Sequence, residues 1–191
     1  ATDVMLERLS AKFAIHRAKD MDNPQAWLAE HGGEVTYVAT NGHDGVKPEY
    51  MAAMPNLKAI SCYGVGYDAI DTQAARVKGV VVTHTPNVLN AEVATTAVML
   101  MMACYRELLR DDAYVRSGHW EKEGSAPLTR TVDGQTVGIL GLGRIGQAIA
   151  QRCHFGFGME VHYVNRSQKE LAFPATQVAD LIALAGQVDF L

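Results

Sequence analysis

Three things that this sequence lacks narrow the classes of protein to which it can belong. Its three cysteines are widely spaced and form no C-x-x-C pair, so neither a disulfide framework nor a zinc site is predicted. Its seven histidines show no H-x-x-x-H spacing, and we expect no metal site of another kind. A net charge of −4 without any basic cluster argues against nucleic acid as a partner.

Long apolar runs are absent as well. The chain opens Ala1-Thr2-Asp3-Val4, without the basic region and apolar core of a secretory signal. No run reaches the roughly 18 apolar residues of a membrane helix. We therefore expect neither export nor a membrane partner, and the cysteine pattern favours a reducing cytoplasm. The 191 residues exceed the usual single domain but fall short of a full two-domain enzyme.

The chain contains an alternation of short helices and strands. After a helical opening, this alternation is typical of a parallel sheet that is covered on both faces. Residues 1–85 are therefore predicted to form one small α/β domain. The predicted strands are residues 34–40, 57–63 and 80–83, and the predicted helices are residues 24–31, 48–54 and 70–78.

A long helix capped by Asn90 is predicted to open a second domain, residues 86–191. Residues 111–117 would extend this helix before Trp120 enters a loop. The chain ends inside an apolar segment, Val188–Leu191, which is predicted to start the third strand of this domain. The domain is therefore expected to be incomplete, with its C-terminal part missing. The expected apolar face of the long helix comprises Val93, Ala97, Leu100, Met101, Cys104 and Leu108.

The most informative stretch of the second domain is a strand, a tight turn and a helix around a G-x-G-x-x-G motif. Gly141 lets the chain reverse, Gly143 leaves room for a ligand, and Gly146 lets helix and strand pack closely. The free N–H groups at the start of the helix suit a pyrophosphate. A merely structural glycine turn remains an alternative for this motif alone.

The end of the following strand indicates which dinucleotide would bind. An NAD enzyme places an acidic residue there, against the ribose hydroxyls. This chain has Asn165, Arg166 and Ser167 instead. Arg166 is suited to pair with a 2′-phosphate, and its two neighbours are able to donate hydrogen bonds. The pattern favours NADP(H), and an ordinary exposed loop arginine is the alternative.

A second glycine-containing loop, residues 63–68, follows the predicted strand at 57–63. Ligands of open α/β sheets bind at the carboxyl ends of strands. Gly64 and Gly66 would allow backbone N–H groups to face a small anion such as a carboxylate. A plain turn between strand and helix explains this stretch equally well. His84, at the end of the next strand, is interpreted as an ordinary polar contact.

Nearly all of the chain resembles the D-2-hydroxyacid dehydrogenases, and within them the glyoxylate and hydroxypyruvate reductases. The resemblance rests on three motifs that occur in a single order. The motifs are Gly64–Asp71, Val81–Leu89 and Gly141–Gly146. The resemblance implies two doubly wound parallel-sheet domains, a flavodoxin-like substrate domain and a Rossmann cofactor domain. It also implies a homodimer, formed through the nucleotide domain and residues 111–127.

The same resemblance assigns site residues. The amides of Val65 and Gly66 would hold the substrate carboxylate, whereas Leu89 and Val93 would line the nicotinamide and pyrophosphate. Family members use an Arg, a Glu and a His for catalysis, and all three would lie beyond Leu191. No catalytic residue is therefore assigned within this chain. The cofactor-binding positions are Gly141, Leu142, Gly143, Arg144, Ile145, Gly146, Asn165, Arg166 and Ser167.

The leading hypothesis is an oxidoreductase that transfers a hydride between NADP(H) and a small 2-keto or 2-hydroxy acid. A dinucleotide-sensing binding protein, similar to a transcriptional corepressor, is a hypothesis of another class. It would need a peptide-docking surface or a basic patch, and the sequence indicates neither. A sister dehydrogenase acting on formate or phosphonate is the third hypothesis.

Overall fold

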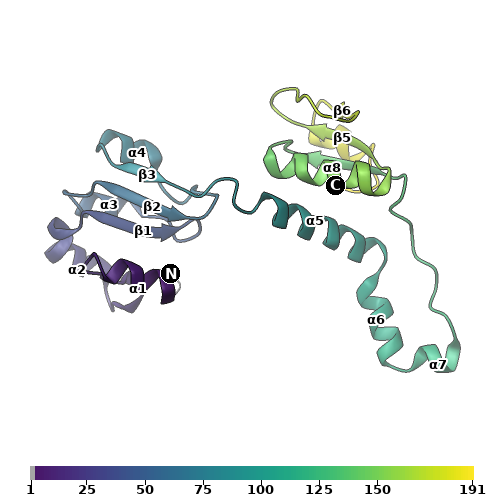
Figure 1. Cartoon of the computed structure of the whole chain (residues 1–191), viewed down its shortest axis with the longest axis horizontal. Helices are drawn as coiled ribbons and strands as arrows, with labels where there is room; N and C mark the ends of the chain where they lie inside the picture. The colour runs from purple at the N-terminus through teal and green to yellow at the C-terminus, as the bar shows by residue number, and fades with distance from the viewer. Residues whose placement is uncertain (1–2) are drawn as a thin grey trace. The chain divides into compact units, whose positions relative to one another are not determined.

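The computed structural model describes residues 3–191 of the chain. These residues divide between Val88 and Leu89 into two compact units, which are described separately below (Figure 1). Both units are α/β and contain parallel sheets. The predicted fold class is confirmed.

The first unit is built on a parallel sheet in the order β1 (Tyr37–Asn41), β2 (Ala59–Tyr63) and β3 (Val81–Thr83). Because β2 is the middle strand, its carboxyl end lies between the ends of its two neighbours. The strand predicted at residue 34 begins later. The reason is that Gly32–Glu34 form a short 3-10 turn, η2, directly after the preceding helix.

Two helices of this unit, α2 and α4, begin with a side-chain cap. Asn23 accepts a hydrogen bond from the Ala26 N–H at 3.0 Å, and Asp71 accepts one from the Ala74 N–H at 2.8 Å. Both contacts satisfy N–H groups that have no partner within the helix. The helical segments are α1 (Asp3–Ser10), η1 (Ala18–Asp20), α2 (Pro24–His31), α3 (Pro48–Ala53) and α4 (Thr72–Val77).

The core of the first unit lies on one face of its sheet. Ile60 and Cys62 alternate along β2 and are 0% and 1% exposed. They pack with Met51 of α3 and Ala75 of α4. Residues on the opposite face of the sheet stay open within the unit, and Tyr63 is 64% exposed. The period of two along each strand produces this division.

The second unit opens with α5 (Asn90–Tyr105), α6 (Leu108–Arg116) and α7 (His119–Glu123). Asn90 is the first helical residue rather than the cap, which is Leu89. The predicted extension is wrong, because Glu107 has a φ of 48° and separates α5 from α6. Trp120 lies in α7 rather than in a loop.

The predicted apolar face of α5 is also largely wrong. Ala94 and Val98 are the buried residues of this helix, whereas Val93 and Leu100 are 39% and 53% exposed. The sequence of α5 is apolar nearly all the way round, so hydrophobic periodicity does not select one face. The contacts of α5 with its neighbours decide which side is buried.

A second parallel sheet follows, in the order β4 (Thr136–Leu140), β5 (Glu160–Val164) and β6 (Thr176–Gln177). Phe190 pairs with Val137 of β4, on the edge that β5 leaves free. The sequence predicts a strand at 188–191, but the structure has only an isolated bridge there, at Phe190, and the sequence overlooks β6. The strand order reverses at β4, which is where doubly wound sheets bind ligands.

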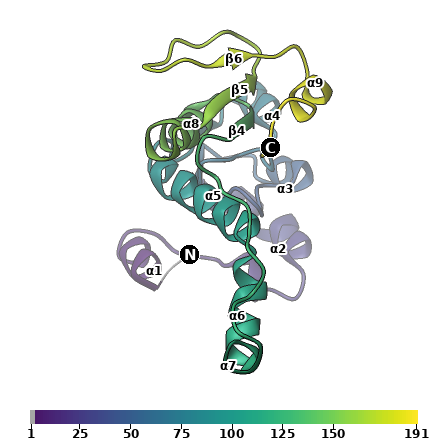
Figure 2. The same ribbon diagram turned by 90° about the vertical axis from the view of Figure 1, so that its right-hand side faces the viewer.

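Helices α8 (Arg144–Phe157) and α9 (Leu181–Ala185) lie on opposite faces of this sheet (Figure 2). A Cβ atom placed on Gly146 of α8 would lie 3.2 Å from the Ile139 side chain. One placed on Gly138 would lie 3.2 Å from Leu184 of α9. Because neighbouring residues of a strand point to opposite faces, the two helices cover different sides of β4.

Candidate functional site

The turn after β4 has the backbone geometry that its glycines predict. Gly141 has a φ of 93°, a conformation that residues with a side chain rarely adopt. Its N–H donates to the Val164 carbonyl at 2.9 Å, which ties the turn to β5. A Cβ on Gly146 would lie 2.2 Å from the Gly141 carbonyl oxygen, so only glycine allows this approach of helix and strand.

The start of α8 forms an open cradle of backbone N–H groups. A Cβ on Gly143 would have no neighbouring atom within 4 Å, which leaves space in front of the turn. Among residues 3–191, the N–H groups of Gly143, Arg144 and Ile145 have no hydrogen-bond partner. They add to the positive end of a 14-residue helix. This arrangement suits the oxygens of a pyrophosphate.

Leu142 serves the turn in a different way from its neighbours. Its side chain is 0% exposed and belongs to the core cluster of the second unit. Its N–H donates to the Asn165 side-chain oxygen at 3.2 Å. Leu142 therefore anchors the turn to the core and to the end of β5.

The three residues after β5 differ in their surroundings: the first has a hydrogen-bonded side chain, and the other two are exposed. The Asn165 amide nitrogen donates to the Ser167 carbonyl at 2.7 Å, so both ends of this side chain are bonded within the chain. Arg166 and Ser167 are exposed. Within the described residues, the Arg166 guanidinium forms no hydrogen bond or ion pair. A positive group thus stands free beside a turn that is held in place by Asn165.

Leu89 and Val93 lie at the start of α5 in the same unit as the glycine turn. The Val93 N–H donates to the Leu89 carbonyl at 3.0 Å, which places the two residues one helical turn apart. Helix α5 runs along α8, and Arg152 of α8 donates to the Ala91 carbonyl at 3.4 Å. The first turn of α5 is thereby joined to the helix that carries the cradle.

The other predicted binding residues, Val65 and Gly66, lie in the first unit, directly after β2. Neither of their N–H groups has a hydrogen-bond partner among residues 3–191. The carbonyls around them are bonded, because the Thr85 N–H donates to the Gly64 carbonyl at 2.9 Å. Two consecutive N–H groups are therefore free at the carboxyl end of the central strand.

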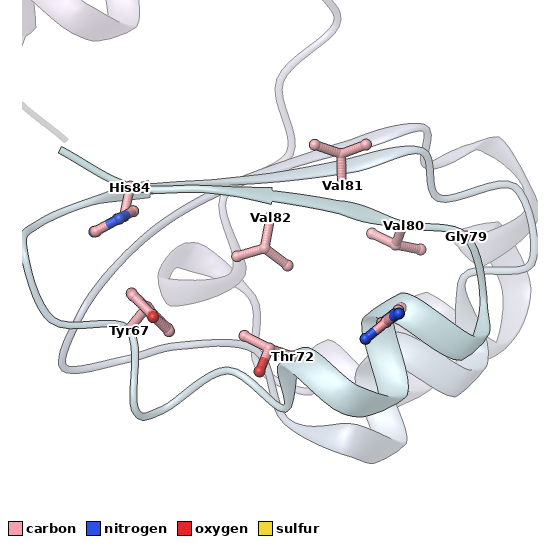
Figure 3. A pocket seen from close by; sticks show the side chains of 8 residues that line it. Tyr67, Thr72, Gly79, Val80, Val81, Val82 and His84 are labelled. Atoms are coloured by element: carbon pink, nitrogen blue, oxygen red, sulfur yellow. The ribbon is translucent and has the colours of Figure 1, made fainter. Parts of the chain in front are cut away.

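A shallow hollow of about 530 Å³ adjoins this loop (Figure 3). Tyr67 and His84 stand at one end of it, and Val80 and Val82 of the β3 segment line its inner side. Val65 and Gly66 are not among its lining residues, so the hollow is a neighbour of the loop rather than the same place. Its lining residues are Tyr67, Thr72, Arg76, Gly79, Val80, Val81, Val82 and His84.

The sequence alone did not predict which residues His84 contacts. Its Nδ1 lies 2.9 Å from the Val65 carbonyl oxygen, and its ring meets the Tyr67 ring edge-on with centroids 4.8 Å apart. The available signal was its position, immediately after the strand that flanks the glycine loop. Sequence reasoning missed the contact because 19 residues separate the two partners.

The described residues contain neither a metal site nor a membrane-spanning helix, and one thiol has a shifted pKa. No cluster of three or more His, Cys, Asp or Glu side chains within residues 3–191 is arranged to hold a metal ion. No helix of this part of the chain combines the length and apolar character needed to cross a membrane. Burial raises the pKa of the Cys153 thiol to about 11. Cys153 lies in the core cluster of the second unit.

Comparison with known proteins identifies the family. Residues 98–191 match the family described as D-isomer specific 2-hydroxyacid dehydrogenase, NAD binding domain. This part of the chain belongs to the D-2-hydroxyacid dehydrogenase family. It is 43% identical over 162 residues to a 2-ketogluconate reductase of Gluconobacter oxydans, a match that covers 85% of this chain and 50% of that protein. The chain thus spans about half the length of the curated relatives it matches.

Solved structures of this dehydrogenase family resemble the chain over nearly its whole length. A 2-hydroxyacid dehydrogenase from Ketogulonicigenium vulgare is 41% identical with a TM-score of 0.90, covering 100% of this chain and 60% of that one. A second match is an NADPH-dependent glyoxylate/hydroxypyruvate reductase from Sinorhizobium meliloti in complex with NADP and malonate. It is 37% identical with a TM-score of 0.81, covering 96% of this chain and 56% of that one.

Proposed function

We propose that the protein containing this chain uses NADPH to reduce a small 2-keto acid, such as glyoxylate or hydroxypyruvate, to the 2-hydroxy acid. The observation that carries the proposal is the glycine cradle at the start of α8, which a hydrogen bond ties to the end of β5. The end of β5 has no carboxylate, and its Arg166 side chain has no partner within the described residues. Family membership supports the reaction class, and the NADPH-dependent relative supports the choice of cofactor.

The described residues fit a dinucleotide. The open space at Gly143 and the unbonded N–H groups of Gly143, Arg144 and Ile145 would receive the pyrophosphate. Arg166 would pair with the 2′-phosphate through charge-assisted hydrogen bonds. Leu89 and Val93 would contact the cofactor at the start of α5. When bound, the cofactor supplies the hydride that reduces the keto carbon.

The chain would bind the substrate through the loop after β2. The N–H groups of Val65 and Gly66 would donate to the two oxygens of the substrate carboxylate. This contact orients the keto acid, and orientation contributes to the rate because it replaces a random encounter with a fixed geometry. The proposal assigns no proton-transfer role to any residue of this chain.

The test is turnover by the natural protein that contains this chain. Adding glyoxylate or hydroxypyruvate to protein and NADPH should consume NADPH, with glycolate or glycerate as the product. NADH should support a lower kcat/KM. Binding of NADPH without turnover of any small 2-keto acid would contradict the proposed reaction and favour a dinucleotide-sensing protein.

A homodimer is part of the same proposal. Large apolar side chains stand exposed on the segment from α6 to residue 128: Leu109 is 83% exposed and Leu128 is 99% exposed. Exposed apolar residues gathered on one segment are typical of protein interfaces. Sedimentation equilibrium should give twice the mass of the single chain, and a monomeric mass at micromolar concentration would refute the dimer.

The proposed location is the reducing cytoplasm. Cys62, Cys104 and Cys153 are all free thiols, and two of them are buried in the cores of their units. Free thiols persist most readily in a reducing compartment. Immunolocalisation of the natural protein would test this expectation.

A further inference from the structure

We propose that His84 is a positioning residue for the carboxylate-binding loop, holding the two N–H groups of Val65 and Gly66 in their binding orientation. This inference rests on the proposed function, because it assigns a role to His84 in the same substrate site. The contact behind this role is the 2.9 Å approach of His84 Nδ1 to the Val65 carbonyl oxygen.

The chemistry of this contact fixes the state of the imidazole. A carbonyl oxygen only accepts hydrogen bonds, so Nδ1 of His84 must carry the proton and donate it. The Tyr67 ring packs edge-on against the imidazole with centroids 4.8 Å apart. Figure 3 shows both rings at the same end of the hollow. The ring is therefore held in place by one hydrogen bond and one aromatic contact.

The planarity of the peptide bond transmits this contact to the binding groups. In a trans peptide the C=O of one residue and the N–H of the next point in opposite directions within one plane. The bond from His84 to the Val65 carbonyl therefore sets the direction of the Gly66 N–H. The bond from the Thr85 N–H to the Gly64 carbonyl, at 2.9 Å, likewise sets the direction of the Val65 N–H.

The other side of the loop is closed by backbone and by β2 itself. A Cβ on Gly42 would lie 2.3 Å from the Gly66 carbonyl oxygen, so the backbone after β1 already touches the loop there. The Cys62 thiol donates to the same carbonyl at 3.5 Å. Gly66 is thus supported by β2 and by the backbone after β1, and His84 and Thr85, which follow β3, support the loop from the other side.

Two substitutions separate the hydrogen bond from the ring. In His84→Phe the aromatic ring can still meet Tyr67, but the donor is lost. In His84→Asn the ring is lost, but the amide nitrogen occupies the position of Nδ1, at the same number of bonds from the backbone. Thr72→Val is the matched control, because Thr72 lines the same hollow and has no hydrogen bond to the loop.

The measurement is an NMR titration of the 191-residue chain with oxamate, an unreactive analogue of a 2-keto acid. The backbone N–H signals of Val65 and Gly66 should shift on binding. His84→Phe should weaken binding by about 2- to 10-fold, as expected for the loss of one neutral hydrogen bond. His84→Asn should stay within about 2-fold of the original chain, and Thr72→Val should be unchanged. The same spectra show whether each variant is folded.

Each outcome decides one question. If oxamate shifts the Val65 and Gly66 signals and His84→Phe binds as tightly as the original chain, the role of His84 is refuted while the carboxylate site stands. If His84→Asn binds as weakly as His84→Phe, the ring rather than the donor matters, which also overturns the inference. If oxamate leaves both signals unmoved in the original chain, the carboxylate site itself fails, and the role of His84 fails with it.

Discussion

The backbone N–H of Leu142 donates to the side-chain oxygen of Asn165 at 3.2 Å, across 23 residues of sequence. This bond joins the glycine turn to the end of β5, the two places where the pyrophosphate and the ribose of a dinucleotide would lie. The amide nitrogen of the same side chain holds the Ser167 carbonyl. Asn165 therefore sets the geometry between two halves of the proposed site.

Replacing Asn165 by alanine should affect both cofactors. The substitution removes two hydrogen bonds, so the free energy of unfolding should fall by roughly 1–2 kcal/mol in urea denaturation. Because the turn loses its tie to β5, affinities for NADPH and NADH should fall by similar factors, measured by fluorescence titration. An unchanged affinity for NADH would show that the turn keeps its geometry without this side chain.

Replacing Arg166 by alanine should affect NADPH alone. The guanidinium is exposed and free of internal partners, so its loss should not alter stability. NADPH binding should weaken by ~1.5–3 kcal/mol, the range for a hydrogen bond to a charged group, while NADH binding stays nearly constant. Calorimetric titration with each cofactor measures this difference.

Arg116→Ala is the control for Arg166→Ala. The Arg116 side chain is 78% exposed and pairs with Asp112 at 2.8 Å. This variant should leave both affinities unchanged, since an exposed ion pair contributes little to stability. Equal losses for NADPH and NADH in Arg166→Ala would refute the proposed preference for NADP(H).

Two glycines of α8 should respond to alanine in opposite directions. In Gly146→Ala the new Cβ would lie 2.2 Å from the Gly141 carbonyl oxygen, so the turn must shift. The free energy of unfolding should fall by about 1–3 kcal/mol. In Gly156→Ala no atom lies within 4 Å of the new Cβ, and stability should rise by ~0.4–1 kcal/mol because the unfolded chain loses freedom. Equal effects at both positions would contradict the close approach at Gly146.

Cys153 should make the stability of the chain depend on alkaline pH. Burial raises the pKa of its thiol from 9.0 to about 11 in the folded state. Between these values the unfolded chain loses the proton while the folded chain keeps it, so deprotonation favours unfolding. The free energy of unfolding should therefore fall as pH rises from 9 to 11, by up to ~2.7 kcal/mol at about 1.36 kcal/mol per pKa unit.

Comparison with Cys153→Ala isolates this contribution from the other groups that titrate at alkaline pH. The difference in unfolding free energy between the original chain and the variant should shrink across that pH range. A difference that is constant from pH 8 to pH 11 would show that the thiol ionises equally well in the folded state.

Local features of this protein follow from the sequence alone. The order of helices and strands is encoded in hydrophobic periods and in helix caps, such as Asn23 and Asp71. The roles of Gly141 and Gly146 are also local, because a turn with positive φ and a close helix approach involve residues a few positions apart. The family follows from three such motifs in one order.

Tertiary structure decided what depends on partners distant in sequence. The two-residue strand β6 is too short to show a period, and the buried side of α5 is chosen by its neighbours rather than by its uniformly apolar sequence. The bonds from Leu142 to Asn165 and from His84 to Val65 span 23 and 19 residues. No local pattern encodes such pairs, since they form only when the sheet brings the ends of adjacent strands together.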